Sequence, residues 1–296
     1  MSFVIATTVT DALAALAAGA RPVAGGSDLV VGARHGKAPL PADLVAIDRI
    51  DGLDCIEITE AGACIGALVN HHSIEAHTAL GAHWSALADG SALVGSPSTR
   101  NVGTIGGNVM NASPAMDTGA PLVVLGAEAE LVSAARGSRR VSMDELWTGP
   151  GRTSAAADEL CVAVHLPALP ERSGSAYLRL EYRRAMEIAV VGAAAMVTLA
   201  GDGSVASVRV ALTAVGPTIL EVTGLSGGTV AEVAAAAGAA ASAQASPISD
   251  LRASDAYRRH SVGVMARRAV ESAARRAAGE IIPVPLNRAV GIGAAS

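Results

Sequence analysis

Two short stretches of the sequence combine adjacent glycines with hydroxyl, amide and carboxylate side chains. The first is Val23-Ala24-Gly25-Gly26-Ser27-Asp28-Leu29, and the second is Thr104-Ile105-Gly106-Gly107-Asn108. Glycine permits a tight turn and lets another molecule approach the backbone closely. Successive backbone N–H groups in such turns form concave sites for anions. The two stretches therefore predict a diphosphate site if the fold brings them together.

The elements around these stretches favour an α/β arrangement at the N-terminus. A helix is predicted over residues 8–18, a strand over 21–24, a helix over 28–35 and a second strand over 44–48. The first glycine pair then lies at a helix N-terminus, where phosphate is stabilised. We expect a small subdomain over residues 1 to about 53.

The rest of the chain predicts a second subdomain and a separate C-terminal domain. Residues 55–68 have the pattern of a hairpin, and strands are expected over 128–133, 139–141 and 159–166. Helices are expected over 72–80, 84–93 and 114–126, and Ser142 with Glu145 forms a capping-box pattern. Residues 168–176 have the composition of a linker. Three strand-like runs (177–183, 188–199 and 205–214) and two helices (230–241 and 254–278) follow it, which indicates an α+β domain.

Composition excludes several classes of protein. The 296 residues are 51% hydrophobic with a net charge of −5 and a single lysine, Lys37, so there is no basic footprint for nucleic acid. The longest apolar run, 188–200, is too short to span a bilayer. The N-terminus lacks the pattern of a secretory signal, so a cytoplasmic location is expected. Three scattered cysteines cannot hold an iron–sulfur cluster.

No motif predicts a catalytic side chain or a metal site. There is no G-x-G-x-x-G fingerprint, and residues 32–38 miss the P-loop pattern by one position and by the hydroxyl that should follow lysine. His71 and His72 are adjacent, but no third ligand lies nearby in the sequence.

The strings TIGGNVMNASPAMD and AGGSDLV resemble the two flavin loops of the FAD-binding (medium) subunits of the molybdenum hydroxylase family. The family includes the carbon monoxide dehydrogenase medium subunit and the xanthine dehydrogenase FAD domain. Residues 183–192 and 250–260 resemble the family's C-terminal domain, so the resemblance extends over nearly the whole chain.

The resemblance implies a fold and a set of FAD contacts. The fold would be α+β: a two-subdomain FAD-binding fold of the vanillyl-alcohol-oxidase/PCMH type over residues 1–170 (subdomains about 1–53 and 54–170), then a carbon monoxide dehydrogenase flavoprotein type domain over 175–285. That domain would contain a three-stranded antiparallel sheet plus helices. Besides both glycine stretches, the implied contacts are Asp117, which a helix cap would also explain, Cys161 and Arg179. Arg179 stands where the family has lysine, and its guanidinium is a planar fork rather than a point charge.

The resemblance also implies a role in a larger complex. Electrons would pass from two [2Fe–2S] clusters on a small subunit through FAD to an external acceptor, and a large subunit would hold the molybdenum cofactor. A dimer of such heterotrimers is expected. Two alternatives stay open: a stand-alone FAD oxidoreductase or a factor that delivers flavin, and a structural subunit that has lost flavin. Covalent attachment of flavin through His71 or His72 is a further alternative. Arginine pairs at 258–259, 267–268 and 275–276 would form a solvated face or dock against a partner.

Overall fold

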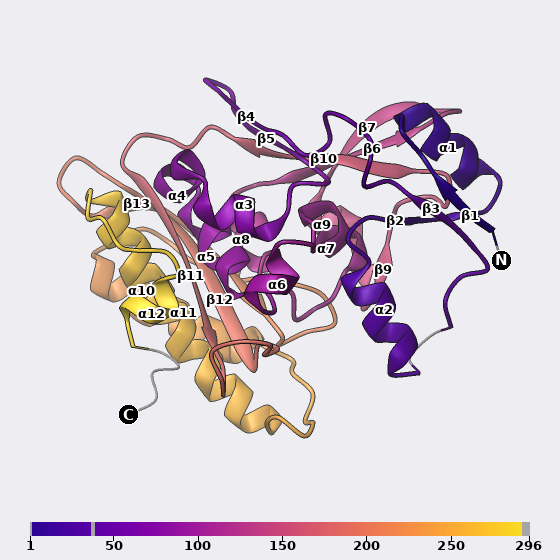
Figure 1. The fold of residues 1–296 in the computed structure, drawn as a ribbon. Helices are drawn as coiled ribbons and strands as arrows, with labels where there is room; N and C mark the ends of the chain where they lie inside the picture. The colour runs from indigo at the N-terminus through magenta and orange to yellow at the C-terminus, as the bar shows by residue number, and fades with distance from the viewer. Residues whose placement is uncertain (1, 37–38, 292–296) are drawn as a thin grey trace.

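Three larger sheets follow one another along the chain (Figure 1). The computed structural model describes residues 2–36 and 39–291, so the end of the near-miss P-loop, including Lys37, lies outside the described residues. In Figure 1 the N-terminal unit lies at the right, the central unit in the middle and the C-terminal unit at the left. None of the helices in the described ranges combines the length and apolar character needed to cross a bilayer.

The N-terminal unit is a three-stranded parallel sheet in the order β1-β3-β2. Its elements are β1 (Ser2–Ile5), α1 (Val9–Ala17), β2 (Arg21–Val23), α2 (Ser27–Arg34) and β3 (Asp43–Ala46). Thr8 caps α1 by accepting a hydrogen bond from the Asp11 N–H, and Leu13 and Leu16 pack into the same core as Val45. Both predicted helices and both predicted strands are present here, whereas β1 was not predicted.

The central unit contains a five-stranded antiparallel sheet in the order β4-β5-β10-β6-β7. The strands of this sheet are β4 (Ile56–Thr59), β5 (Gly62–Gly66), β6 (Glu128–Ser133), β7 (Gly137–Ser142) and β10 (Leu160–Pro167). The unit also has a two-stranded sheet of β8 (Trp147–Gly149) and β9 (Arg152–Thr153). Its helices are α3 (His71–Ala76), α4 (Thr78–His83), α5 (Ser85–Leu93), α6 (Pro97–Arg100), α7 (Ile105–Asn111), α8 (Gly119–Val124) and α9 (Met143–Leu146). The predicted capping box is wrong, because the Ser142 side chain makes no cap hydrogen bond.

The C-terminal unit contains a four-stranded sheet in the order β11-β12-β13-β14 and two long helices. Its elements are β11 (Ser173–Leu180), β12 (Val191–Leu199), β13 (Val205–Thr213), β14 (Leu220–Glu221), α10 (Val230–Gln244), α11 (Asp255–Ala277) and α12 (Leu286–Ala289). We predicted three strands in this sheet, and this prediction is wrong because the sheet has a fourth strand, β14, at its edge. At two residues, β14 is too short to give a hydrophobic pattern, and the ion pair between Glu221 and Arg209 of β13 (2.7 Å) helps to hold it.

The predicted linker at 168–176 overlaps the first half of β11, which begins at Ser173. Ser175 is fully buried, and its hydroxyl accepts the N–H of Ala86 on α5 at 3.0 Å. The small residues of this segment therefore reflect close packing against the central unit.

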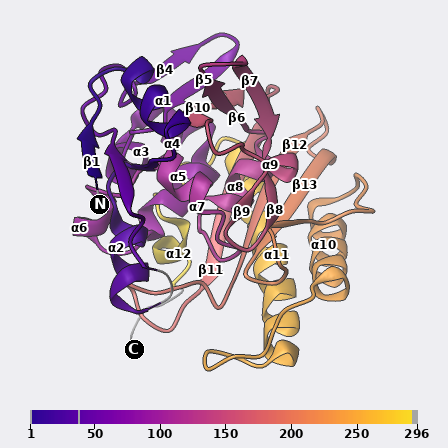
Figure 2. The same cartoon turned by 90° about the vertical axis from the view of Figure 1, so that its right-hand side faces the viewer.

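The C-terminal sheet is buried on both faces (Figure 2). Helices α10 and α11 cover one face, where Leu178 and Ala193 point, and α5 and α8 of the central unit cover the other, where Tyr177 and Ala194 point. Burial on both faces explains why the strands are nearly continuous hydrophobic runs. One face of the C-terminal sheet consequently belongs to the hydrophobic core of the central unit, and the other face forms a separate core with α10 and α11.

A buried carboxylate joins these two units. Asp89 on α5 has no exposed surface, and its Oδ2 lies 2.6 Å from Nη1 of Arg276 on α11. The same carboxylate accepts the backbone N–H groups of Tyr177 at 3.2 Å and Leu286 at 2.8 Å. One side chain of the central unit thus holds three segments of the C-terminal unit.

We predict that Asp89→Asn lowers the free energy of unfolding by about 3 kcal/mol, because it leaves the buried Arg276 guanidinium without a counter-charge. Urea denaturation followed by circular dichroism measures the loss. The matched control is Asp158→Asn, which changes the exposed Arg136–Asp158 pair and should have a far smaller effect. Equal losses in the two variants would contradict this role of Asp89.

Candidate functional site

The two glycine stretches lie against one another although they are far apart in the sequence. A Cβ placed on Gly25 would lie 1.9 Å from the carbonyl oxygen of Val102, two residues before Thr104. A Cβ placed on Gly103 would lie 3.6 Å from Oγ of Ser27. The first loop therefore packs on the segment that leads into the second, and only glycine fits at position 25.

The first loop presents unpaired backbone donors. Gly26 has φ +67°, a left-handed conformation that suits glycine, and it precedes the first turn of α2. Among the described residues, the N–H groups of Gly26, Ser27 and Leu29 have no hydrogen-bond acceptor. A helix N-terminus with free N–H groups stabilises an anion. This loop fits a diphosphate.

The second loop is the first turn of helix α7, and not the open turn expected from the sequence. Thr104 is the N-cap residue, and the N–H groups of residues 105–108 are all paired within the chain. Their acceptors are the carbonyl oxygens of Val69 for Ile105, of Ala67 for Gly106 and of Thr104 for Asn108, and the hydroxyl of Thr104 for Gly107. These N–H groups are therefore not free donors, and the expectation that they bind phosphate stays a prediction.

Position 106 requires glycine because the backbone packs closely against Ala67, and not because the chain turns there. A Cβ on Gly106 would lie 2.6 Å from the Cβ of Ala67. Gly107 is exposed, so a ligand can approach the backbone there, and Asn108 beside it is half-buried. The polar groups that α7 can still offer a ligand are side chains, chiefly the Asn108 amide.

His71 lies beneath the junction of the two loops. Its side chain is 1% exposed, its backbone N–H donates to the Gly103 carbonyl at 3.1 Å, and its Cδ2 lies 3.5 Å from the Cβ position of Gly103. Burial, assisted by the charge of Arg100, lowers the pKa of His71 to about 4. A buried, neutral imidazole packs the loops from below and is poorly placed for covalent attachment to flavin.

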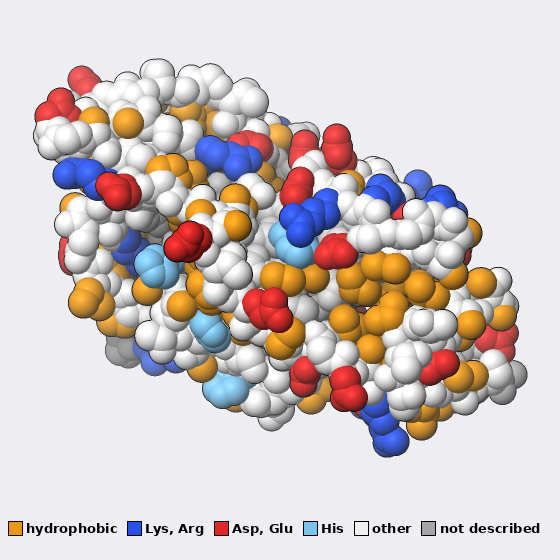
Figure 3. All heavy atoms as spheres, turned by 90° about the horizontal axis from the view of Figure 1, so that it is seen from above, with side chains coloured by type: hydrophobic (Ala, Val, Ile, Leu, Met, Phe, Trp, Pro, Cys, Tyr) orange, Lys and Arg blue, Asp and Glu red, His pale blue; other side chains and the backbone are white. Residues whose placement is uncertain are grey.

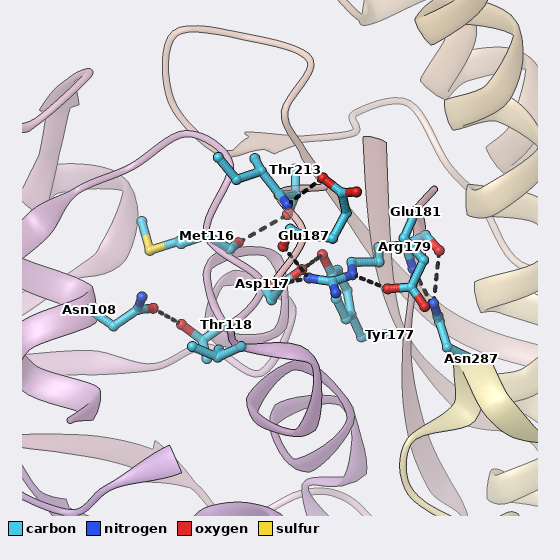
Figure 4. A network of polar contacts seen from close by, with 12 residues as sticks. Asn108, Met116, Asp117, Thr118, Tyr177, Arg179, Glu181, Glu187, Thr213 and Asn287 are labelled. Carbon is cyan, nitrogen blue, oxygen red and sulfur yellow. Dashed lines mark hydrogen bonds and ion pairs between the residues drawn. The ribbon is translucent and has the colours of Figure 1, made fainter. Parts of the chain in front are cut away.

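Asp117 and Arg179, both predicted as cofactor contacts, contact each other (Figure 4). Nη1 of Arg179 lies 2.6 Å from Oδ2 of Asp117, and the Tyr177 hydroxyl donates to Oδ1 of Asp117 at 2.9 Å. Nε of Arg179 lies 2.6 Å from Glu181, and Nη1 also donates to the Glu187 carbonyl at 3.2 Å. The planar fork of arginine reaches both carboxylates at once, which the single ammonium group of lysine cannot do in the same way.

This network is buried. Arg179 has no exposed surface, and Asp117 is 6% exposed. Burial and the neighbouring Asp117 carboxylate raise the pKa of Tyr177 well above its usual value, so the phenol stays protonated and donates. Nη2 of Arg179 is buried and has no hydrogen-bond partner within the described part of the chain. The network fixes the segment after α7 from the side of the C-terminal unit.

Cys161, the remaining predicted contact, lies in the core of the central unit on β10. It is 5% exposed, and burial raises the pKa of its thiol to about 12. The thiol is therefore a small apolar group at neutral pH.

Sequence reasoning missed three residues of this region: Val102, Thr118 and Tyr177. The hydroxyl of Thr118 donates to Oδ1 of Asn108 at 2.5 Å. Tyr177 lies two positions before Arg179 on β11, but nothing in the sequence indicates that it contacts Asp117. Val102 carries no chemical signal, since its contact uses the backbone.

A groove of about 620 Å³ lies elsewhere, against the five-stranded sheet. Its lining includes Glu57, Cys64, Glu128, Arg140 and His165, and none of its residues belongs to the glycine loops. Figure 3 shows the upper face of the molecule, where acidic, basic and histidine side chains alternate with hydrophobic patches. Among the described residues, no cluster of His, Cys, Asp and Glu could hold a metal ion. The groove is separate from both glycine loops and is not the candidate site.

The arginine pairs of α11 do not form one face. Arg258 and Arg276 are buried and bind Asp250 and Asp89, whereas Arg267 and Arg275 are about half exposed and pair with acidic residues of the same segment. Two of the six arginines thus stabilise the fold, which the sequence could not distinguish from a solvated face.

Comparison with known proteins gives matches over most of the chain. The family model described as the FAD binding domain in molybdopterin dehydrogenase matches residues 1–169. The model of the CO dehydrogenase flavoprotein C-terminal domain matches residues 176–273.

Individual relatives agree with these matches. The xanthine dehydrogenase FAD-binding subunit of Escherichia coli O157:H7 is 30% identical over 285 residues, which cover 93% of this chain and 97% of the relative. The carbon monoxide dehydrogenase medium chain of Afipia carboxidovorans is 34% identical over 278 residues, covering 91% and 95%. Among solved structures, a chain of the cyanide-inactivated Cu,Mo-CO dehydrogenase gives a TM-score of 0.87 at 32% identity, covering 93% of this chain and 98% of that one.

The burial of His71 predicts a pH dependence of stability. Its pKa is lowered from 6.5 to about 4 on folding, so the unfolded chain binds a proton between these values that the folded chain does not. The stabilising contribution is complete above pH 6.5 and is lost as the pH falls towards 4, with a slope of up to about 1.4 kcal/mol per pH unit. Urea denaturation between pH 7 and 4.5 measures how the free energy of unfolding falls with pH. In His71→Gln this fall should be shallower by up to about 1.4 kcal/mol per pH unit. His72→Gln, which replaces the neighbouring histidine at a 53% exposed side chain, is the matched control. An unchanged slope in His71→Gln would contradict the assignment.

Proposed function

We infer the role of this chain from one premise: it belongs to the family of FAD-binding subunits of the molybdenum hydroxylases. The family models together match residues 1–169 and 176–273, and relatives at 30% identity or more align over nearly their full length. The protein is accordingly an oxidoreductase subunit whose part is to bind FAD. FAD supplies the electron-transfer chemistry, and the chain's residues bind and orient it.

We propose that the first glycine loop holds the FAD diphosphate. The observation that carries this proposal is the contact of Gly25 with Val102, which brings the free N–H groups of Gly26, Ser27 and Leu29 beside the start of α7. Three fixed donors at the positive end of a helix match a doubly charged diphosphate. Val23, Ala24 and Asp28 complete this loop.

The second loop would contribute by close approach and by side chains. Exposed Gly107 leaves room beside the backbone, and the Asn108 amide and the Thr104 hydroxyl are the polar groups of this turn. Ile105 is fully buried and anchors the turn in the core. Asp117 and Arg179 would support the site from behind by fixing the segment that follows α7, and Cys161 as a flavin contact stays a prediction.

We propose that FAD here receives electrons from two [2Fe–2S] clusters on a small partner subunit and passes them to an external acceptor. A large partner subunit would hold the molybdenum cofactor, in a dimer of heterotrimers. The exposed apolar surface of the N-terminal unit supports an assembled state. Phe3, Val4 and Ile5 of β1 are 45–62% exposed, and α2 buries no residue while exposing Val30 and Val31. Monomeric soluble proteins rarely leave such apolar surface uncovered.

The site assignment predicts the effect of a single methyl group. Gly25→Ala should weaken FAD binding by about tenfold or more, because the new Cβ would overlap the Val102 carbonyl and force the two loops apart. Flavin absorbance of the purified chain and titration of the deflavinated chain with FAD measure the effect.

The matched control is Gly32→Ala on helix α2, which follows the loop; a Cβ there meets no described atom within 4 Å, and FAD affinity should be unchanged. If Gly25→Ala bound FAD as tightly as Gly32→Ala, the loop assignment would be wrong. Absence of flavin from the wild-type chain itself would favour a structural subunit.

A further inference from the structure

A buried hydroxyl is aimed at the side chain of Asn108. Thr118 has no exposed surface, and its Oγ1 lies 2.5 Å from Oδ1 of Asn108 (Figure 4). Thr118 occupies the N-cap position of α8, yet its side chain makes no cap hydrogen bond. The hydroxyl is therefore used for Asn108 and not for its own helix.

The chemistry of the two groups fixes the orientation of the amide. A hydroxyl has one hydrogen to donate, and a buried donor needs an acceptor. Within the described part of the chain, the Asn108 oxygen is the acceptor that Thr118 contacts. If the amide were turned over, its NH₂ group would donate to the hydroxyl, whose own hydrogen would then be buried without an acceptor. The oxygen of Asn108 therefore faces Thr118, and the NH₂ group faces away from it.

This orientation decides what α7 can offer a ligand. The N–H groups of residues 105–108 already donate hydrogen bonds to acceptors within the protein. Nδ2 of the half-buried Asn108 has no acceptor among the described residues. Phosphate oxygens are acceptors, so the NH₂ edge attracts them and the oxygen edge repels them. An asparagine free to turn would present either edge.

The position of Thr118 is itself held firmly. The preceding residue, Asp117, is bound by Tyr177 and Arg179 of the C-terminal unit, and the Thr118 carbonyl accepts the Leu122 N–H at 3.0 Å. A hydroxyl on a fixed backbone can hold a neighbouring amide in one orientation.

We propose that Thr118 is a positioning residue for FAD: its hydroxyl holds the Asn108 amide so that the NH₂ edge faces the FAD diphosphate. The proposal rests on the proposed contact between Asn108 and FAD. It assigns to Thr118 an effect on binding that is transmitted through one side chain, without contact between Thr118 and the cofactor.

The test is a double-mutant cycle in the full-length, deflavinated chain, with the Kd for FAD measured by flavin fluorescence. Thr118→Val keeps the shape of the side chain and removes the hydroxyl, and the Kd should rise about fivefold, as expected for one neutral hydrogen bond. Thr118→Ser restores the hydroxyl and should bind within about twofold of wild type. In an Asn108→Ala background, Thr118→Val should have no further effect, since the amide it orients is gone.

Controls separate positioning from a general loss of structure. Thr198→Val removes a comparable threonine hydrogen bond, to Ser173 at 2.8 Å in the C-terminal sheet, and should leave the Kd unchanged. Melting temperatures of the apoproteins identify variants that fold poorly. If Thr118→Val fails to fold, Thr118→Ala serves in the same cycle.

The outcomes distinguish this inference from the assignment beneath it. A fivefold effect of Thr118→Val that persists in the Asn108→Ala background, or no effect in either, overturns the positioning role. An Asn108→Ala variant with the wild-type Kd overturns the proposed contact of Asn108 with FAD, and the inference with it.

Discussion

The packing of Gly25 on the Val102 carbonyl is the contact on which the rest of the site depends. With no side chain at position 25, the turn before α2 approaches the segment before α7 more closely than any other residue would allow. The approach places the free amides of the first loop beside the exposed backbone of the second. The two loops then offer different groups to the cofactor. The first presents N–H donors, and the second presents the exposed backbone of Gly107 and the oriented side-chain amide of Asn108.

The C-terminal unit is part of this arrangement because buried charges connect it to the central unit. Asp89 binds Arg276 of α11, and Asp117 binds Arg179 of β11. Isolated buried charges are costly, so each pair favours the docked arrangement in which both partners are present. Arg179 also binds Glu181, and this second contact gives a physical reason for arginine at a position where the resemblance led us to expect lysine.

Much of the organisation could be predicted from sequence because it depends on local signals. The glycine stretches, the α1 cap at Thr8 and the hydrophobic strands β12 and β13 are all visible in the residue pattern. Other features depend on contacts between distant segments. The second glycine pair proved to be helical, since Thr104 caps α7 and Gly106 packs on Ala67. Likewise, the short strand β14 and the partners of Arg179 become apparent only when the chain is folded.

Hydrogen exchange at individual amides, with and without FAD, tests the central claim most directly. The amides of Gly26, Ser27 and Leu29 have no acceptor among the described residues, so they should exchange rapidly in the deflavinated protein and slowly once FAD is bound. The amides of residues 105–108 are already paired and should be protected in both states. If FAD binds without protecting the first-loop amides, the cofactor's diphosphate lies elsewhere and the account of the site is wrong.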